Sequence, residues 1–260
     1  MSRASSAVAL FVAAALGASA AGAADQKAKA TGTLKDLESR EVQVVRDPPT
    51  DVRQQQAIEQ YRRFLELQSD NAKMRAEATR RLGDLQVEVD ESSRATGEAS
   101  LSGAELGEAI KLYEGLLAAQ PDYERNDAVM YQLARAYEAQ AQPEKALAVL
   151  DQLVTKRSGS PWVTESQFRR GEILFSAGRY RDAEAAYAAV IHAGVDSGFY
   201  DQGLYKHGWS LFKQSRGEEC VASFLRLLDR MLVNDGKLRE GDSLSRPERE
   251  LSDDALRAMA

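Results

Sequence analysis

The sequence has 260 residues, with 34 Lys and Arg against 40 Asp and Glu, so its formal net charge is −6. Nucleic-acid-binding proteins usually present a basic face, and this acidic chain has no Lys/Arg cluster to form one, so we exclude nucleic acid as a partner. The single cysteine, Cys220, cannot form a disulfide within the chain. Its place on an apolar helix stripe favours a small buried residue over a reactive thiol.

The first residues have the three parts of a secretory signal peptide. Arg3 supplies a positive charge, the uncharged run from Ala7 to Leu16 is too short to span a bilayer, and small residues over 18–23 suit signal peptidase. We therefore predict a cleavable signal over residues 1–23, a mature chain that begins between Ala21 and Asp25, and a periplasmic location. The alternative is a buried Ala-rich helix, which does not account for the flanking residues.

Residues 24–50 are predicted to form a flexible linker. Polar residues are frequent there, and Pro48-Pro49 prevents a helix just before the first periodic segment. The β-branched stretch from Val42 to Val45 suits a short extended piece, but it has no second strand to pair with. No later apolar run is long enough to span a bilayer, so we expect no integral membrane anchor.

From residue 51 the pattern is helical, and it repeats every 37 residues. Small residues recur at this spacing, and a large apolar residue follows each of them four positions later. A second small residue stands twelve positions earlier, with an aromatic residue three positions before it. The four columns are Ala146, Ala183 and Cys220; Leu150, Tyr187 and Phe224; Ala134, Gly171 and Gly208; and Tyr131, Phe168 and Tyr205. Self-similarity of this length predicts an α-solenoid of helix-turn-helix units.

The columns have a physical explanation in helix packing. Small residues let the two helices of a unit approach closely, while the large residues fill the groove between them. Turn residues fall where such units need them: Pro143 and Pro161 suit helix starts, and Gly178 suits a left-handed C-terminal cap. Asn126 and Ser160 are predicted N-caps.

Two weaker units precede these repeats. Ala109 and Tyr113 match the second helix of a unit whose first helix holds Gly83, but the spacing between the two small residues is 26 instead of 12. We therefore predict an insertion in this turn, over about 88–101, and a helix that restarts at a capping box of Ser102 and Glu105. The stretch around Ala57 and Tyr61 is similar to the second helix of a still earlier half-unit.

The C-terminal end differs from the repeats. Asn234-Asp235-Gly236 interrupts the helical pattern, a polar stretch runs to Pro247, and a final helix is predicted from about Ser252 to Ala260. Apolar residues on this helix have no second helix to cover them; they are Leu251, Leu256 and Met259. We expect residues 234–260 to be a linker and the start of a further helix, so that the chain is a piece of a longer array or needs a partner at this end.

The columns resemble the tetratricopeptide-repeat superfamily, whose usual period is about 34 residues. The longer period here is assigned to longer turns at Ser158–Ser160 and Val195–Ser197. The resemblance implies an all-α fold, a right-handed α-solenoid with about four to five units over residues 51–233. Within the superfamily, the chain is most similar to large periplasmic repeat proteins of Gram-negative envelopes. It is less similar to the TolA-binding coordinator of cell constriction, whose coiled coil it lacks.

Residues capable of catalysis or metal binding are few. The two histidines, His192 and His207, have no second His, Cys or paired carboxylate at ligand spacing, and the chain has no phosphate-binding loop. We interpret His192 as a helix-end residue and His207 as a packing residue. The sequence therefore predicts no enzyme activity, no catalytic or metal site and no cofactor.

The resemblance also implies a partner-binding surface, because first helices of such arrays line a concave groove. Carried onto this sequence, the groove residues are Tyr131, Arg135, Glu138, Phe168, Glu172, Phe175, Tyr205, Trp209, Phe212 and Lys213. The aromatic column through Phe168 is also what packing between first helices would produce, and both interpretations stay open. Phe175, Trp209 and Phe212 fall outside that column, so we expect them to be exposed. Arg135 and Lys213 are expected to bind acidic groups of a partner.

The function predicted from this resemblance is a non-catalytic periplasmic scaffold that binds other envelope proteins through the groove and serves cell-envelope or cell-wall machinery. The alternative is an accessory or regulatory subunit of an envelope enzyme or of a polysaccharide or protein export complex. Partner identity would separate the two, and turnover by the isolated chain would revive an enzyme hypothesis.

Overall fold

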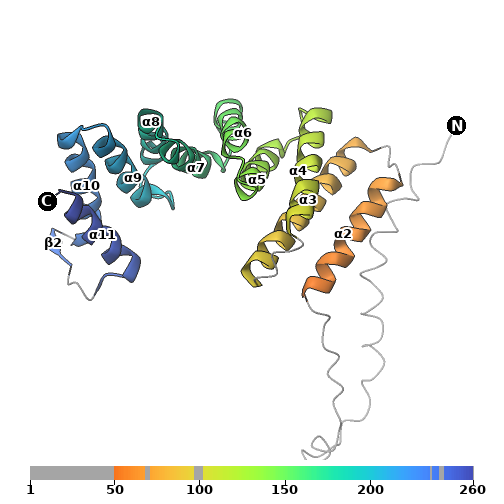
Figure 1. The fold of residues 1–260 in the computed structure, drawn as a ribbon, viewed down its shortest axis with the longest axis horizontal. Coiled ribbons are helices and arrows are strands. Elements are labelled where there is room, and N and C mark those ends of the chain that lie inside the picture. The colour runs from red at the N-terminus through yellow and green to blue at the C-terminus, as the bar shows by residue number, and fades with distance from the viewer. Residues whose placement is uncertain (1–49, 68–70, 97–101, 235, 240–242, 260) are drawn as a thin grey trace, which may run out of the picture. The chain divides into compact units, whose positions relative to one another are not determined.

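The computed structural model describes residues 50–67, 71–96, 102–234, 236–239 and 243–259. The predicted signal, the predicted linker up to residue 49 and the last part of the predicted insertion lie outside these residues. The described chain is helical apart from one short hairpin (Figure 1). Its elements are α2 (Thr50–Glu66), α3 (Ala72–Thr96), α4 (Ser102–Ala119), α5 (Asn126–Ala139), α6 (Pro143–Lys156), α7 (Val163–Ser176), α8 (Tyr180–His192), α9 (Tyr200–Lys213), α10 (Gly217–Leu232), β1 (Val233–Asn234), β2 (Lys237–Leu238) and α11 (Arg246–Met259).

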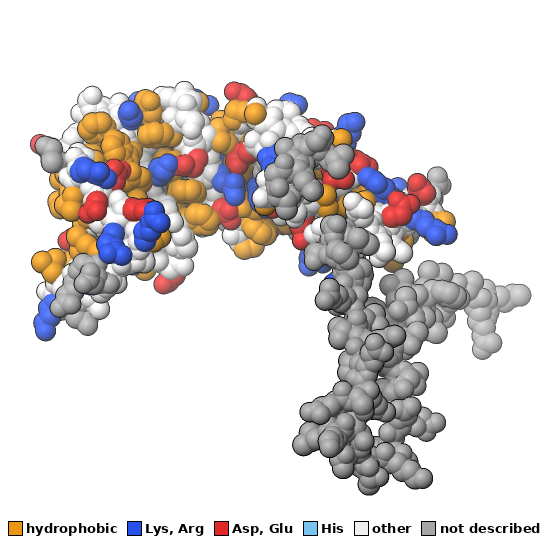
Figure 2. All heavy atoms as spheres, turned by 60° about the horizontal axis from the view of Figure 1, so that its bottom comes forward, with side chains coloured by type: hydrophobic (Ala, Val, Ile, Leu, Met, Phe, Trp, Pro, Cys, Tyr) orange, Lys and Arg blue, Asp and Glu red, His pale blue; other side chains and the backbone are white. Residues whose placement is uncertain are grey.

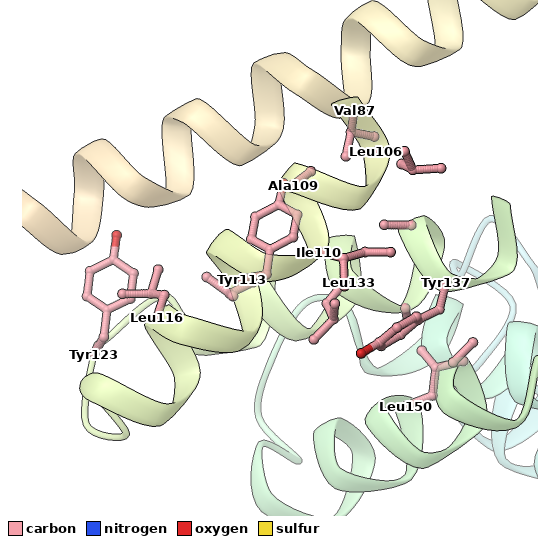
Figure 3. Packing of buried hydrophobic residues seen from close by; sticks show 14 of the residues in the cluster. Val87, Leu106, Ala109, Ile110, Tyr113, Leu116, Tyr123, Leu133, Tyr137 and Leu150 are labelled. Carbon is pink, nitrogen blue, oxygen red and sulfur yellow. The ribbon is translucent and has the colours of Figure 1, made fainter. Parts of the chain in front are cut away.

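Each helix packs against the next one along the chain. The most extensive contacts join α3 to α4, α7 to α8, and α9 to both of its neighbours, α8 and α10. A shared core runs through α3 to α6; in Figure 3, Leu133, Tyr137 and Leu150 point toward one another. The predicted all-α solenoid of helix-turn-helix units is therefore confirmed, as is a helix, α2, over Ala57 and Tyr61.

Small residues in the first helices allow a close approach of the second helices. A Cβ atom on Gly208 would lie 2.7 Å from Cε1 of Phe224, and one on Gly83 would lie 2.7 Å from Cε1 of Tyr113. The same addition at Gly171 would overlap the ring of Tyr187. These contacts are the physical reason for the column of small first-helix residues and for the column of large residues that follows it sixteen positions later, as in Gly171 and Tyr187.

The tyrosines at these contacts need a hydrogen-bond partner for the buried hydroxyl group. The Tyr113 hydroxyl donates to Oδ1 of Asp84 at 2.8 Å, and the Tyr187 hydroxyl donates to Glu172. Each carboxylate directly follows the glycine that its tyrosine covers. The glycine, the following carboxylate and the tyrosine therefore form one packing unit.

The predicted turn residues behave in different ways. Pro143 is the first residue of α6 and Gly178 has φ of +74° after the end of α7, as predicted. Asn126 is not an N-cap: it is the first residue of α5, and its amide donates to the carbonyl oxygens of Gln120 and Pro121. Ser160 is not the N-cap of α7 either, because Trp162 holds that position; Oγ of Ser160 accepts from the backbone amide of Trp162 at 3.2 Å, three residues before α7 begins.

The predicted insertion, which lies between the small residues of α3 and α4, is helical in its first part and not a loop. Helix α3 continues through Glu88 to Thr96, so it is 25 residues long. Buried residues such as Val87 and Asp90 continue along this extension, and Arg94 pairs with Asp90 at 2.9 Å. The spacing of small residues shows that extra residues are present, but it does not distinguish a loop from a longer helix. Helix α4 starts at Ser102 as predicted, although the side chain of Ser102 lies outside the described residues.

The C-terminal prediction is wrong in two respects. Helix α11 begins at Arg246 instead of Ser252, because Ser245 and Glu248 form a capping box: the backbone amide of Ser245 donates to Oε2 of Glu248 at 2.7 Å. Its apolar face is largely covered, since Ala255 is fully buried and two neighbouring residues pack into the α9–α10 core. These two residues are Leu251 and Met259, whereas Leu256 remains exposed. Before α11, β1 and β2 form an antiparallel pair that the sequence did not predict.

We predict that Gly171→Ala lowers the free energy of unfolding by about 1–3 kcal/mol, because the added methyl group overlaps the Tyr187 ring. Gly115→Ala is the matched control, since Gly115 is also helical but, apart from its own stretch of helix, no atom lies within 4 Å of the position that an added methyl group would take. There the change should stabilise by up to about 1 kcal/mol, because alanine has the higher helix propensity. Chemical denaturation of both variants measures the difference; equal effects would contradict the close-approach argument.

Candidate functional site

A groove of about 820 Å³ lies between the C-terminal end of α5, the start of α6 and helix α7. Its lining combines apolar and charged side chains, and Figure 2 shows the same mixture on the face drawn there. The lining residues are Glu138, Pro143, Glu144, Leu147, Glu165, Phe168, Arg169, Glu172, Ile173, Ser176, Ala177, Arg179 and Phe199.

The apolar part of the groove comes from successive units. The rings of Phe168 and Phe199 are tilted against each other with centroids 5.3 Å apart, and Phe168 also meets the edge of Tyr187 at 5.8 Å. Leu147 on α6 packs into the same cluster as Phe168. These contacts hold Phe168 between its own unit and the next, so its ring is fixed in place while part of its surface faces the groove.

The charged wall of the groove is held by Arg169. Its guanidinium pairs with Glu138 at 2.9 Å and with Glu165 at 3.1 Å, so it connects α5 to α7. It also lies over the ring of Tyr131, 5.5 Å from the centroid, and the Tyr131 hydroxyl donates to Glu165. Burial and this hydrogen bond raise the pKa of Tyr131 to about 12, and burial raises the pKa of Glu138 above its ordinary value.

Glu172 has a structural partner on each side. It accepts the hydrogen bond of the buried Tyr187 hydroxyl and pairs with Nζ of Lys206 on α9 at 2.9 Å. Lys206 also lies 5.9 Å from the centroid of the Phe175 ring. Glu172 therefore joins two consecutive units while its side chain lines the groove.

The structure brings only part of the sequence-predicted set to this groove. Glu138, Phe168 and Glu172 line it. The other seven residues lie elsewhere, and the partner-binding role of all ten stays a prediction. Three of the seven are engaged within or between units: Tyr131 stacks on Trp162 with centroids 4.3 Å apart, and Arg135 pairs with Glu91 on α3. The third, Tyr205, donates to Asp254 on α11.

The expected exposure of the remaining aromatic residues is only partly met. Phe212 is 48% exposed and Lys213 is exposed, but Phe175 is half-buried beside Tyr180. Trp209 is also half-buried: its indole nitrogen is inaccessible, and its ring contacts Phe224 with centroids 6.1 Å apart. Trp209 follows Gly208, as Glu172 follows Gly171. The second-helix ring of this unit is Phe224, which has no hydroxyl group, and Trp209 packs against it where Glu172 accepts a hydrogen bond from Tyr187.

The sequence analysis missed several lining residues, among them Phe199, whose ring forms part of the apolar floor. Phe199 precedes α9, and Trp162 stands 37 residues earlier, directly before α7. Phe199 lies against Phe168, and Trp162 lies against Tyr131. In both cases the partner is the aromatic residue in the first helix of the preceding unit. This aromatic column was present in the sequence, but it falls in the turns, which were interpreted only as spacers.

The residues considered for chemistry occupy packing positions or the surface. His207 is half-buried with Nδ1 2.9 Å from Oγ of Ser223, and its pKa is lowered by burial. His192 is exposed, and Cys220 is buried. Within the described residues, no three His, Cys, Asp or Glu side chains are grouped as metal ligands. None of the described helices combines the length and the apolar character needed to cross a membrane.

We predict that Trp209→Ala lowers the free energy of unfolding by about 2–4 kcal/mol, because the indole packs against Phe224 and the α9–α10 core. Phe212→Ala is the comparison, since the Phe212 ring is largely exposed, and it should change stability by less than about 1 kcal/mol. Thermal and chemical denaturation measure both. Unchanged stability in Trp209→Ala would mean that this ring is available to partners, as the sequence first suggested.

Residues 104–163 match the family model of the tetratricopeptide repeat. A comparison with curated protein sequences gave no significant match. The solved structure of YrrB, described as a TPR protein with an unusual peptide-binding site, is 21% identical with a TM-score of 0.54, covering 80% of this chain and 85% of YrrB.

Two further solved structures have a similar fold at low identity. Kinesin light chain repeats of Podosopora anserina are 20% identical with a TM-score of 0.51, covering 69% of this chain and 87% of the other. MamA of AMB-1 is 18% identical with a TM-score of 0.50, covering 69% of this chain and 90% of the other. Residues 104–163 thus match a tetratricopeptide repeat, and the described chain has the fold of a tetratricopeptide-repeat-like α-solenoid.

Proposed function

We propose that this protein is a non-catalytic scaffold that binds a segment of a partner protein in the groove between α5, α6 and α7. The observation that carries the proposal is a groove with an apolar floor whose charged walls are already fixed by ion pairs. Preorganised side chains lose little conformational freedom on binding, which favours recognition of a peptide segment. The peptide-binding site that is described for YrrB, a protein of the same fold, supports a similar use here.

We further propose that the scaffold acts in the periplasm, on cell-envelope or cell-wall machinery. This part of the proposal is supported by the first residues of the sequence, where Arg3, the apolar run to Leu16 and the small residues after it fit a signal peptide. The alternative role, an accessory subunit of an envelope enzyme or export complex, would use the same groove.

Binding in the groove is tested by filling it. Ala177 is exposed, lines the groove and follows the last residue of α7, so Ala177→Trp should block the groove at little cost to the fold. Ala148→Trp is the matched control, because Ala148 is exposed on α6 and does not line the groove. Peptides selected from a random displayed library on the full chain should lose about tenfold or more in affinity for Ala177→Trp and bind Ala148→Trp normally.

Fluorescence anisotropy with the selected peptides gives the affinities, and circular dichroism checks that both variants keep their helices. If every selected peptide binds both variants equally well, the partner site lies elsewhere on the solenoid and the proposed use of this groove is wrong.

Export predicts a processed N-terminus. When the full gene is expressed in a Gram-negative host, the purified native protein should begin between Ala21 and Asp25 and be released with the periplasmic fraction. Arg3→Glu combined with Leu10→Asp should abolish processing, because it removes the positive charge and interrupts the apolar run. N-terminal sequencing decides the matter: a protein that begins at Met1 or Ser2 would contradict the periplasmic proposal.

A further inference from the structure

We propose that the groove binds a cationic segment, one in which a Lys or Arg stands close to an apolar side chain. This inference rests on the proposed function, because it concerns the occupant of the same groove. It differs in emphasis from the expectation drawn from the sequence, where Arg135 and Lys213 were expected to bind acidic groups of a partner, because neither of these residues lines this groove.

The first argument is the charge of the lining. Four carboxylates and two guanidinium groups line the groove, so their formal charge is 2 − 4 = −2. These are Glu138, Glu144, Glu165 and Glu172 against Arg169 and Arg179. The nearest charged partners outside the lining do not change this sum, since Lys206 pairs with Glu172 and Asp182 pairs with Arg179. A groove with excess negative charge favours a positively charged occupant.

The second argument is that the two arginines are already in use. Arg169 is shared between Glu138 and Glu165, and Arg179 pairs with Asp182 at 2.7 Å. An acidic segment would therefore have to compete with existing ion pairs for these guanidinium groups. A basic segment meets no such requirement, because it would add a cation to carboxylates that outnumber their partners.

Two carboxylates are placed to receive that cation. Glu144 is exposed in the first turn of α6, and within the described residues it forms no ion pair. Glu138 shares its single arginine with Glu165, and burial raises its pKa. An additional positive charge near Glu138 would offset that burial, because it stabilises the ionised form.

The helix ends add to this preference. Glu138 lies in the last turn of α5, and Ser176 and Ala177 form the end of α7 that lines the groove. The carboxyl end of a helix carries partial negative charge and favours cations. The amino end of α6 has the opposite preference, but Glu144 already occupies it.

The apolar floor sets the second requirement on the occupant. Phe168 and Phe199 present two ring surfaces to the groove beside Leu147. A Leu, Ile or aromatic side chain next to the basic residue would bury its apolar surface there, which favours binding because that surface is removed from water. A purely basic segment would leave this floor uncovered.

The test uses peptides selected on the full chain from a random displayed library. Those that lose binding to Ala177→Trp are the groove-dependent ones, and these should be enriched in Lys or Arg beside an apolar residue. Glu144→Gln should weaken their binding about threefold to fivefold, Glu144→Lys should weaken it further, and added salt should weaken binding to the unaltered chain.

The control variants are Glu218→Gln and Glu218→Lys, because Glu218 is exposed in the first turn of α10 and does not line the groove. They change the net charge equally and should leave binding unaffected. If groove-dependent peptides are acidic or uncharged, or if the Glu144 and Glu218 variants behave alike, the cationic inference is wrong and the proposed function stands. If no selected peptide depends on the groove, both are wrong.

Discussion

The close approach of the two helices within each unit is the contact on which the other features depend. A glycine in the first helix lies against a large ring in the second, at Gly83 and Tyr113 and again at Gly208 and Phe224, with no space for a methyl group. Dispersion and apolar burial favour this contact, but a buried tyrosine needs an acceptor for its hydroxyl group. The residue after the glycine meets that need in α3, where it is Asp84.

The groove follows from the same contact. Because Glu172 accepts the Tyr187 hydroxyl, its position on α7 is fixed from within its own unit, and its second oxygen can pair with Lys206 of the next unit. Arg169 connects α7 in the same way to the preceding unit, through its ion pair with Glu138 on α5. Charged side chains that satisfy buried groups or join units thus form the walls of the groove. Their net negative charge results from packing requirements as well as from any requirement of a partner.

The helix pairs could be predicted from the sequence because their contacts repeat at one spacing, as Ala146 and Ala183 illustrate. The failures occur where a position has more than one structural solution. Extra residues after Gly83 lengthen α3, although a loop would give the same spacing. Trp209 was assigned to the surface because it falls outside a column, yet it packs on Phe224 from the position at which α3 and α7 have a carboxylate, Asp84 and Glu172. Phe199 lies in a turn, where no periodicity of helix faces applies.

The contacts of α11 show that the repeating element is a spatial relation and not a fixed number of residues. The Tyr131 hydroxyl donates to Glu165, which is 34 residues later, and the Tyr205 hydroxyl makes the same kind of bond to Asp254, which is 49 residues later. The residue that follows the acceptor is small and buried in both cases, Ser166 and Ala255. Helix α11 therefore lies against α9 as a first helix lies against the one before it. The extra residues contain the β1–β2 hairpin, and they are tolerated because the entropic cost of closing a longer loop rises only slowly with its length.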